Sequence, residues 1–318
     1  MKDDPRYQPL DAAKSPRFAD IATFFRLPRM DISGDIDIAL VGVPFDLGVN
    51  FRAGARHGPA AVREASRVIR RMHPSTGTAP FSLCNVADIG DTPMNALDMM
   101  GSLQLIQDFF ERIHAVGAVP LSVGGDHTIP LPILRVVAKR EPVGIVQFDS
   151  HADTLDTLLG SRINHATTFR RACEEGLVDP RRTIQIGLRG SRFGPEDVAF
   201  GEQVGMRLIT MDDYEAMGRD AVIGEIDRVT GSGPTYISFD IDGLDAAYAM
   251  GTGVPEVGGF NMRDAQMMIR CLRGKRLVGG DICEVAPMYD PTGQTQLNAA
   301  NLLFEMLCVV AESKAGSH

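Results

Sequence analysis

The sequence predicts an α/β fold built on a parallel β-sheet. Short runs rich in β-branched residues alternate with longer segments in which apolar residues recur every three or four positions, as in strands that are connected by helices. With 318 residues, 44% of them apolar, the chain can bury a large core. No repeat and no linker-like tract divides it. We therefore expect a single domain over residues 1–318, with residues 1–34 as an N-terminal extension.

Eight segments are expected to form strands. Each is a short, mainly apolar run next to turn residues, which is typical of strands that are buried on both faces of a parallel sheet. They are residues 36–43, 84–89, 118–123, 143–148, 183–188, 207–210, 235–239 and 277–282.

Helices are expected between these strands, wherever apolar residues follow the helical period. The clearest segments are residues 59–72, 97–116, 265–273 and 297–313. Pro59 supports the first of them, because proline is favoured in the first turn of a helix.

Composition and charge exclude several classes of function. A net charge of −9, with no basic stripe of interleaved aromatic residues, argues against a nucleic-acid partner. No stretch approaches the ~20 apolar residues of a membrane span, and the N-terminus lacks the apolar core of a secretory signal. The 5 cysteines form no Cys-x-x-Cys pair, which argues against a disulfide framework or a structural zinc site. We expect a cytoplasmic protein with no membrane partner.

Acidic and histidine residues follow three of the expected strands. The clusters are Gly124-Gly125-Asp126-His127, Asp149-Ser150-His151-Ala152-Asp153 and Asp240-Ile241-Asp242. Ligands of parallel α/β sheets bind outside the carboxyl ends of the strands, and carboxylates and imidazoles suit divalent metals. A lone Asp or His after a strand is more often a cap or a loop residue. The Asp-x-His-x-Asp run, however, places three potential ligands on one face of an extended segment, which favours a site for two ions.

These clusters resemble the signatures of the ureohydrolase family, which includes arginase, agmatinase and guanidinobutyrase. The third signature extends from Ser238 to Asp245. The resemblance reaches from Gly42-Val43-Pro44-Phe45-Asp46 and Gly54-Ala55-Arg56-His57-Gly58-Pro59 to Asp281-Ile282-Cys283-Glu284-Val285-Ala286-Pro287, which is almost the whole chain. It implies a three-layer α/β/α sandwich with an eight-stranded parallel sheet, in agreement with the strands expected above.

The resemblance also implies two divalent metal ions, with Mn²⁺ as the first expectation and Ni²⁺ as the alternative. One ion would be held by His127, Asp149, Asp153 and Asp240, and the other by Asp149, His151, Asp240 and Asp242. Asp149 and Asp240 would bridge the two. Such a pair generates a hydroxide from a shared water. Its attack on the guanidinium carbon of a guanidino compound would release urea, or a urea derivative, and an amine.

Two further residues are implied by the motifs to take part in the reaction. Glu284 matches the family residue that pairs with the guanidinium, and His165, in the string from Asn164 to Phe169, matches the histidine that handles protons. A delocalised guanidinium needs both an orienting carboxylate and a proton donor for the departing amine. Outside such motifs, a Glu after a strand or a His in a loop is usually a surface residue, so both assignments depend on the resemblance.

The chain departs from the family strings at positions around the expected pocket: Ser150, Ala166, Ala246, Met250 and Val254. Ala166 replaces a glycine, so we expect that its loop can take another path. We expect the loss of proline at Ala246 and Met250 to loosen the loop after the metal-binding strand. No metal ligand is replaced.

These departures leave the substrate open among a short guanidino acid, an alkylated guanidine and a biguanide. A formimino-group hydrolase and a non-catalytic partner subunit are alternative functions. The second is disfavoured because all six ligand positions are filled. The family usually assembles as trimers or hexamers, so an oligomer is expected, formed from one chain or together with a related subunit.

Overall fold

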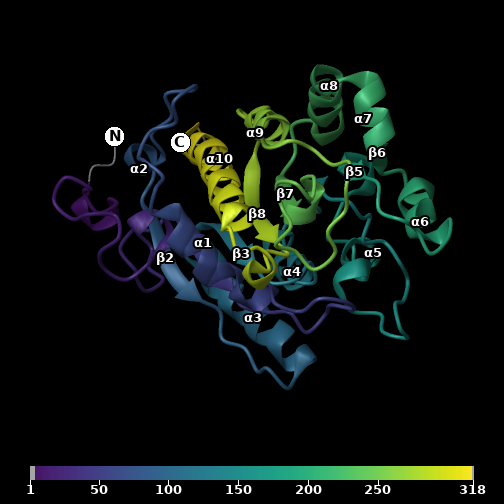
Figure 1. Ribbon diagram of the computed structural model, residues 1–318, viewed down its shortest axis with the longest axis horizontal. Coiled ribbons are helices and arrows are strands. Elements are labelled where there is room, and N and C mark those ends of the chain that lie inside the picture. The colour runs from purple at the N-terminus through teal and green to yellow at the C-terminus, as the bar shows by residue number, and fades with distance from the viewer. Residues whose placement is uncertain (1–3, 317–318) are drawn as a thin grey trace.

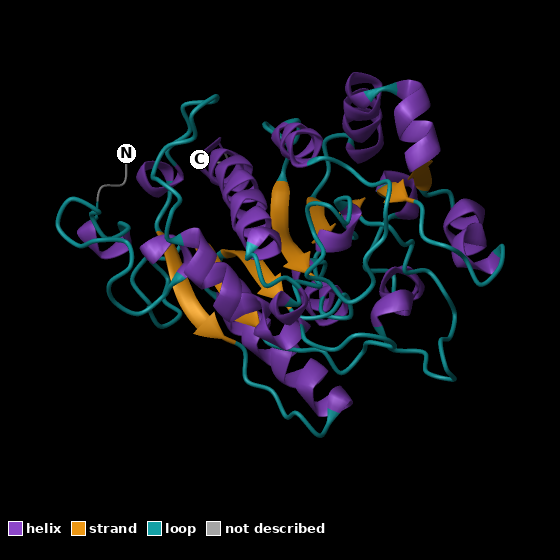
Figure 2. Cartoon of the chain, in the orientation of Figure 1, coloured by secondary structure: helices purple, strands orange, loops and turns teal. Residues whose placement is uncertain are grey.

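The computed structural model describes residues 4–316 and shows a three-layer arrangement, with helices on both faces of a central sheet (Figures 1 and 2). The sheet is 8-stranded and parallel throughout. Its strands are β1 (Ile38–Val43), β2 (Val86–Asp91), β3 (Val119–Gly124), β4 (Gly144–Phe148), β5 (Ile184–Leu188), β6 (Arg207–Thr210), β7 (Thr235–Asp240) and β8 (Leu277–Cys283). The predicted fold class is confirmed, and every expected strand is present close to its expected bounds.

The helices lie on the two faces of the sheet. They are α1 (Gly58–Ser66), α2 (Pro80–Leu83), α3 (Met99–Ala115), α4 (Pro130–Val137), α5 (Thr168–Glu174), α6 (Glu196–Val204), α7 (Met211–Met217), α8 (Arg219–Thr230), α9 (Met262–Arg270) and α10 (Gln294–Gly316). The first helix is shorter than expected and ends at Ser66. Ser66 and Arg67 instead bind the N-terminal segment: the Ser66 hydroxyl accepts from Phe25 N, and Arg67 donates to the carbonyl oxygens of Arg17 and Ala19.

Alternate residues of each strand feed two separate apolar cores. In β1, Ile38 and Leu40 belong to the core formed with α1 and α7 to α10, while Ala39 and Val41 belong to the core formed with α3, α4 and α5. A strand buried on both faces must be apolar at nearly every position. This explains why the strands were recognisable as continuous apolar runs.

The strand order places the polar clusters side by side. The order is β2-β1-β3-β8-β7-β4-β5-β6, so β3, β8, β7 and β4 are successive neighbours in the middle of the sheet. His127, Glu284 and Asp149 lie directly after β3, β8 and β4, and Asp240 is the last residue of β7. Because the strands are parallel, the four segments meet at one edge of the sheet.

The segment before β1 packs on this sheet. Phe24 and Phe25 are buried, and Phe24 N donates to the carboxylate of Asp88 in β2 at 2.9 Å. Residues 1–3 of the expected N-terminal extension lie outside the described part of the chain. Within residues 4–316, none of the helices combines the length and the apolar character that crossing a membrane requires.

Candidate active site

The loop after β3 places His127 inside the molecule. Gly125 allows this, because a Cβ at that position would lie 2.2 Å from the carbonyl oxygen of Phe45. The imidazole of His127 is buried. The main-chain carbonyl oxygen of His127 accepts a hydrogen bond of 2.7 Å from the Thr168 hydroxyl, and its main-chain N–H donates to Glu284 Oε1 at 2.9 Å. Neighbouring segments therefore fix the main chain of His127.

A first group of potential ligands surrounds His127 Nδ1. This nitrogen lies 2.9 Å from Asp153 Oδ2, 3.0 Å from Asp149 Oδ2 and 3.3 Å from Asp240 Oδ2. It is buried and makes no hydrogen bond of good geometry with any of them. A histidine nitrogen with no hydrogen-bond partner that faces three carboxylate oxygens is suited to bind a divalent cation.

A second group lies next to the first and shares Asp149. The ligand atoms of Asp149, His151 and Asp242 lie within 4.8 Å of one another. His151 Nδ1 is 3.2 Å from Asp242 Oδ2 and 3.7 Å from Asp149 Oδ1. The two oxygens of Asp149 thus face different groups, as a bridging ligand requires. Asp240 lies in the first group, and its Oδ1 accepts a hydrogen bond from Asp242 N.

The four carboxylates of these groups carry more negative charge than their surroundings offset. Burial, followed by the charges of Asp153 and Asp242, raises the pKa of Asp149 to about 7. Burial and the neighbouring carboxylates also raise the pKa of Asp240 well above its ordinary value. Two divalent cations would supply the four positive charges that four ionised carboxylates need. The residues present therefore fit a binuclear metal centre.

Polar side chains behind the ligands fix their orientation. His127 Nε2 lies 2.8 Å from the Ser238 hydroxyl, which itself donates to Asp281 Oδ1 at 2.8 Å. Because the serine proton is committed to Asp281, Nε2 is the protonated nitrogen, and the lone pair of Nδ1 points at the carboxylates. Gln147 Nε2 donates to Asp149 Oδ2 at 2.7 Å. No role was expected for Gln147, Ser238 or Asp281, since only the folded geometry shows what they contact.

Glu284 divides its two oxygens between different tasks. Oε1 accepts from His127 N at 2.9 Å and lies 3.2 Å from His165 Nδ1. Oε2 is buried and has no hydrogen-bond partner among residues 4–316. Glu284 adopts a positive φ of 62°, which few residues other than glycine favour, and its amide donates to Gly125 O at 2.8 Å. Sequence-predicted Glu284 and His165 are therefore in direct contact, with one oxygen left for another group.

His165 is held as a cation by its surroundings. Burial opposes its charge, but the hydrogen bond to Glu284 and the charges of Glu284, Asp153 and Asp126 outweigh burial and raise the pKa of His165 to about 9. The residue begins a short 3-10 helix, His165–Thr167, that Asn164 caps through its side chain. Ala166 lies within this turn and is not among the residues with a positive φ, so its own backbone does not need a glycine.

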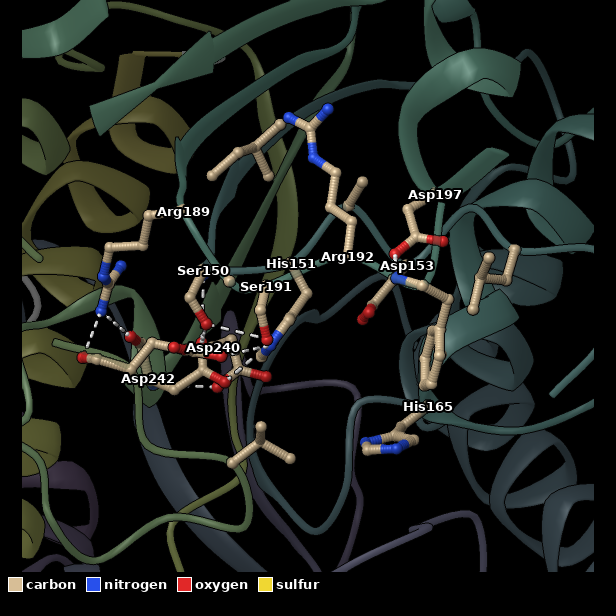
Figure 3. Close-up of a pocket in the computed structure, with 18 of the residues that line it drawn as sticks. Ser150, His151, Asp153, His165, Arg189, Ser191, Arg192, Asp197, Asp240 and Asp242 are labelled. Carbon is tan, nitrogen blue, oxygen red and sulfur yellow. Dashed lines mark hydrogen bonds and ion pairs between the residues drawn. The ribbon is translucent and has the colours of Figure 1, made fainter. Parts of the chain in front are cut away.

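A pocket of about 310 Å³ opens onto these groups. In Figure 3, Ser150, His151, Asp240 and Asp242 gather on one side, and His165 approaches from a separate segment. The departures Ala166 and Val254 line the pocket wall, whereas Ala246 and Met250 do not. Ser150, a third departure, donates from its hydroxyl to Asp242 Oδ1 at 2.6 Å and so supports a predicted ligand.

Arg189 fixes the loop that follows β7. Its guanidinium donates to six main-chain oxygens, with distances between 2.7 and 3.2 Å, and Figure 3 shows it directed at the segment of Asp242. These acceptors are Gly187, Asp242, Gly243, Leu244, Glu256 and Val257. The loop that provides Val254 is therefore tied through its main chain, despite the prolines missing at Ala246 and Met250. No motif of the sequence had singled out Arg189.

Comparison with known proteins agrees with this geometry. The profile of the arginase family matches residues 36–308. A guanidinopropionase of Pseudomonas aeruginosa is 50% identical over 311 residues, with 98% of both chains covered, and a guanidinobutyrase of the same species is 44% identical, with 96% of this chain and 97% of that one covered. The solved structure of proclavaminate amidino hydrolase from Streptomyces clavuligerus superimposes with a TM-score of 0.90 at 35% identity, covering 94% of this chain and 100% of that one. The resemblance seen in the sequence is confirmed, and the chain belongs to the arginase family.

Proposed function

We propose that this chain is a binuclear metal hydrolase that cleaves a C–N bond of a guanidino compound and releases urea, or a urea derivative, and an amine. The observation that carries the proposal is the pair of ligand groups sharing Asp149, next to a pocket in which Glu284 keeps one oxygen without a partner. The relatives named guanidinopropionase and guanidinobutyrase support the guanidino class.

The proposed ligands are His127, Asp149, Asp153 and Asp240 for one ion and Asp149, His151, Asp240 and Asp242 for the other. Bound there, the two ions would supply a water that is nucleophilic at neutral pH. We propose Mn²⁺ as the native metal, with Ni²⁺ as the alternative, because both accept mixed carboxylate and imidazole ligands. We also propose a single domain with residues 1–34 as an extension, a cytoplasmic location, and a trimer or hexamer, with or without a related subunit.

The roles of the other groups follow from their contacts. Glu284 Oε2 orients the guanidinium through charge-assisted hydrogen bonds, while Oε1 keeps His165 in place. Protonated His165 donates to the nitrogen of the departing amine, which turns a poor leaving group into a neutral amine. Asp126, behind this pair, binds Gly48 N and Thr128 N and so joins the loops after β1 and β3.

The test of the proposed function is urea and amine release by metal-loaded protein from a panel of substrates. The panel contains guanidinopropionate, guanidinobutyrate, an N,N-dialkylguanidine, a biguanide, arginine, agmatine and a formimino amino acid. We expect arginine and agmatine to be poorer substrates than a smaller or N-substituted guanidine, because two of the departures from the family strings, Ala166 and Val254, lie in the pocket lining. Efficient agmatine hydrolysis would contradict this interpretation. Hydrolysis confined to the formimino compound would contradict the guanidino assignment, and inactivity on the whole panel would favour a partner subunit.

The substitution Glu284→Gln should lower kcat/KM at least about tenfold, equivalent to ~1.4 kcal/mol of transition-state binding. The amide keeps the shape of the side chain but removes the charge that faces the guanidinium. Metal content, measured by elemental analysis, should stay unchanged because Glu284 is outside both ligand groups. The matched control is Glu196→Gln, an exposed glutamate at the start of α6, which should behave as the wild type. Equal kcat/KM in Glu284→Gln and wild-type protein would exclude the proposed role.

A further inference from the structure

The imidazole of His165 contacts one polar group at each ring nitrogen. Nδ1 lies 3.2 Å from Glu284 Oε1, and Nε2 lies 2.9 Å from Oδ1 of Asn50. Asn50 lines the pocket and belongs to the loop after β1, 115 positions before His165 in the sequence. The same loop also contacts the backbone of His165, because Gly48 O accepts a hydrogen bond of 3.2 Å from His165 N.

The two partners of the ring differ in what they can do after a proton has left. A carboxylate only accepts hydrogen bonds, so Glu284 favours a proton on Nδ1 at every stage. A primary amide has both an acceptor oxygen and a donor NH₂ group. Asn50 therefore can accept from a protonated Nε2 and, after rotation of its amide, donate to a deprotonated Nε2. Nε2 is the nitrogen that can lose its proton without leaving a repulsive contact.

We infer that Asn50 is a positioning residue for His165 that makes Nε2 the proton-donating nitrogen. The inference rests on the proposed function. In the donating step the Nε2–H bond breaks, and the proton goes to the amine nitrogen as the bond from this nitrogen to the former guanidinium carbon breaks. His165 is left neutral with its proton on Nδ1. It regains a proton at Nε2 from the attacking water, so the cycle consumes one water and releases urea and an amine.

The charged groups around His165 do not replace this function of Asn50. The carboxylates of Glu284 after β8, Asp126 after β3 and Asp153 after β4 all favour the cationic ring and raise the pKa of His165, against the lowering effect of burial. Of these, Glu284 contacts the ring, and it does so at Nδ1. Their charges set how readily His165 holds a second proton, whereas the contact with Asn50 selects the nitrogen that gives it up.

Two substitutions at Asn50 separate these effects. Asn50→Ala removes both the acceptor and the donor, and Asn50→Asp keeps an acceptor but cannot donate to a neutral ring. We expect kcat of the metal-loaded protein to fall about tenfold in both, the size of one hydrogen bond to a charged group, with little change in KM. The alkaline limb of the pH profile should move in opposite directions: to lower pH in Asn50→Ala, which loses an acceptor, and to higher pH in Asn50→Asp, which gains a negative charge.

Epistasis with His165 tests whether Asn50 acts through the ring. The double variant His165→Ala/Asn50→Ala should be no slower than His165→Ala, because the group that Asn50 positions is already missing. Asn301→Ala is the control, since the Asn301 amide bonds only to Leu297 O in its own helix, and it should match the wild type. Multiplicative losses in the double variant, or alkaline limbs that do not separate, would overturn the inference.

A spectroscopic measurement is independent of turnover. In protein loaded with Zn²⁺, a diamagnetic ion, and labelled with ¹⁵N-histidine, the neutral His165 ring should carry its proton on Nδ1 in the wild type. Asn50→Ala should weaken this preference. A neutral ring protonated on Nε2 in the wild type would overturn the inference. If the wild-type protein hydrolyses no guanidine, the proposed function fails, while the ring titration still decides the role of Asn50.

Discussion

Asp149→Asn is expected to disturb both metal ions at once. Asp149 presents Oδ2 to His127 and Oδ1 to His151, so one neutral amide would replace a charged ligand in both groups. Changes behind the ligands commonly cost 10- to 100-fold in metal affinity or activity, and the loss of a shared ligand should exceed about 100-fold in activity. Elemental analysis of the purified variant should find fewer than two ions per chain. Asp240→Asn should behave similarly, because Asp240 is the second proposed bridging ligand.

The control for this pair is Asp212→Asn, an exposed aspartate in the first turn of α7 that lies outside both ligand groups. It should keep the metal content and activity of the wild type. An Asp149→Asn protein that retains full activity with one ion or none would contradict the binuclear proposal.

His165→Ala is expected to lower kcat by roughly 10² to 10⁴, the range for a lost general acid or base. The protein loses the donor that protonates the departing amine, whereas the ligand groups remain intact, so metal content should not change. In the wild type, activity should fall as the pH rises through about 9, because the donor is the protonated ring. This alkaline decline should be absent from the residual activity of the variant.

His114→Ala provides the comparison for a histidine outside the pocket, on α3. It should have normal turnover and a normal pH profile. Normal turnover in His165→Ala itself would remove that residue from the mechanism.

The strands and the residues after them were predictable for a physical reason. Strands that are buried on both faces must be apolar along most of their length, so the polar residues at or just after their ends, such as Asp240 and Asp149, stand out in the sequence. The lateral order of the strands could not be predicted in this way, because crossover segments of similar length can join either neighbouring or distant positions in a sheet. The adjacency of β3, β8, β7 and β4 is a property of the folded sheet.

The groups that contact the ligands and His165 from behind were harder to foresee. Asn50 precedes His165 by 115 positions and carries no motif, and a glutamine such as Gln147 in a strand gives no signal of its own. Only the folded geometry shows that Gln147 donates to Asp149 and that Asn50 lies against His165. At Ala166 the sequence shows only that a glycine is replaced, whereas the fold shows that the residue lies in a 3-10 turn with no positive φ.

The contacts of Arg189 bear on how such an enzyme diversifies. Its guanidinium binds carbonyl oxygens, which every residue type has, so these contacts do not depend on which side chains the loop between β7 and α9 carries at the bonded positions. The carboxylate of Asp245, which accepts from Ala247 N and Gly258 N, is a side chain in the loop that adds to them. Positions such as Val254 are then free to mutate with little penalty to folding, and selection can alter which molecule is accepted while the ligand geometry is inherited unchanged. Through Arg189, residues of this loop that line the pocket can change while the metal-ligand geometry is kept.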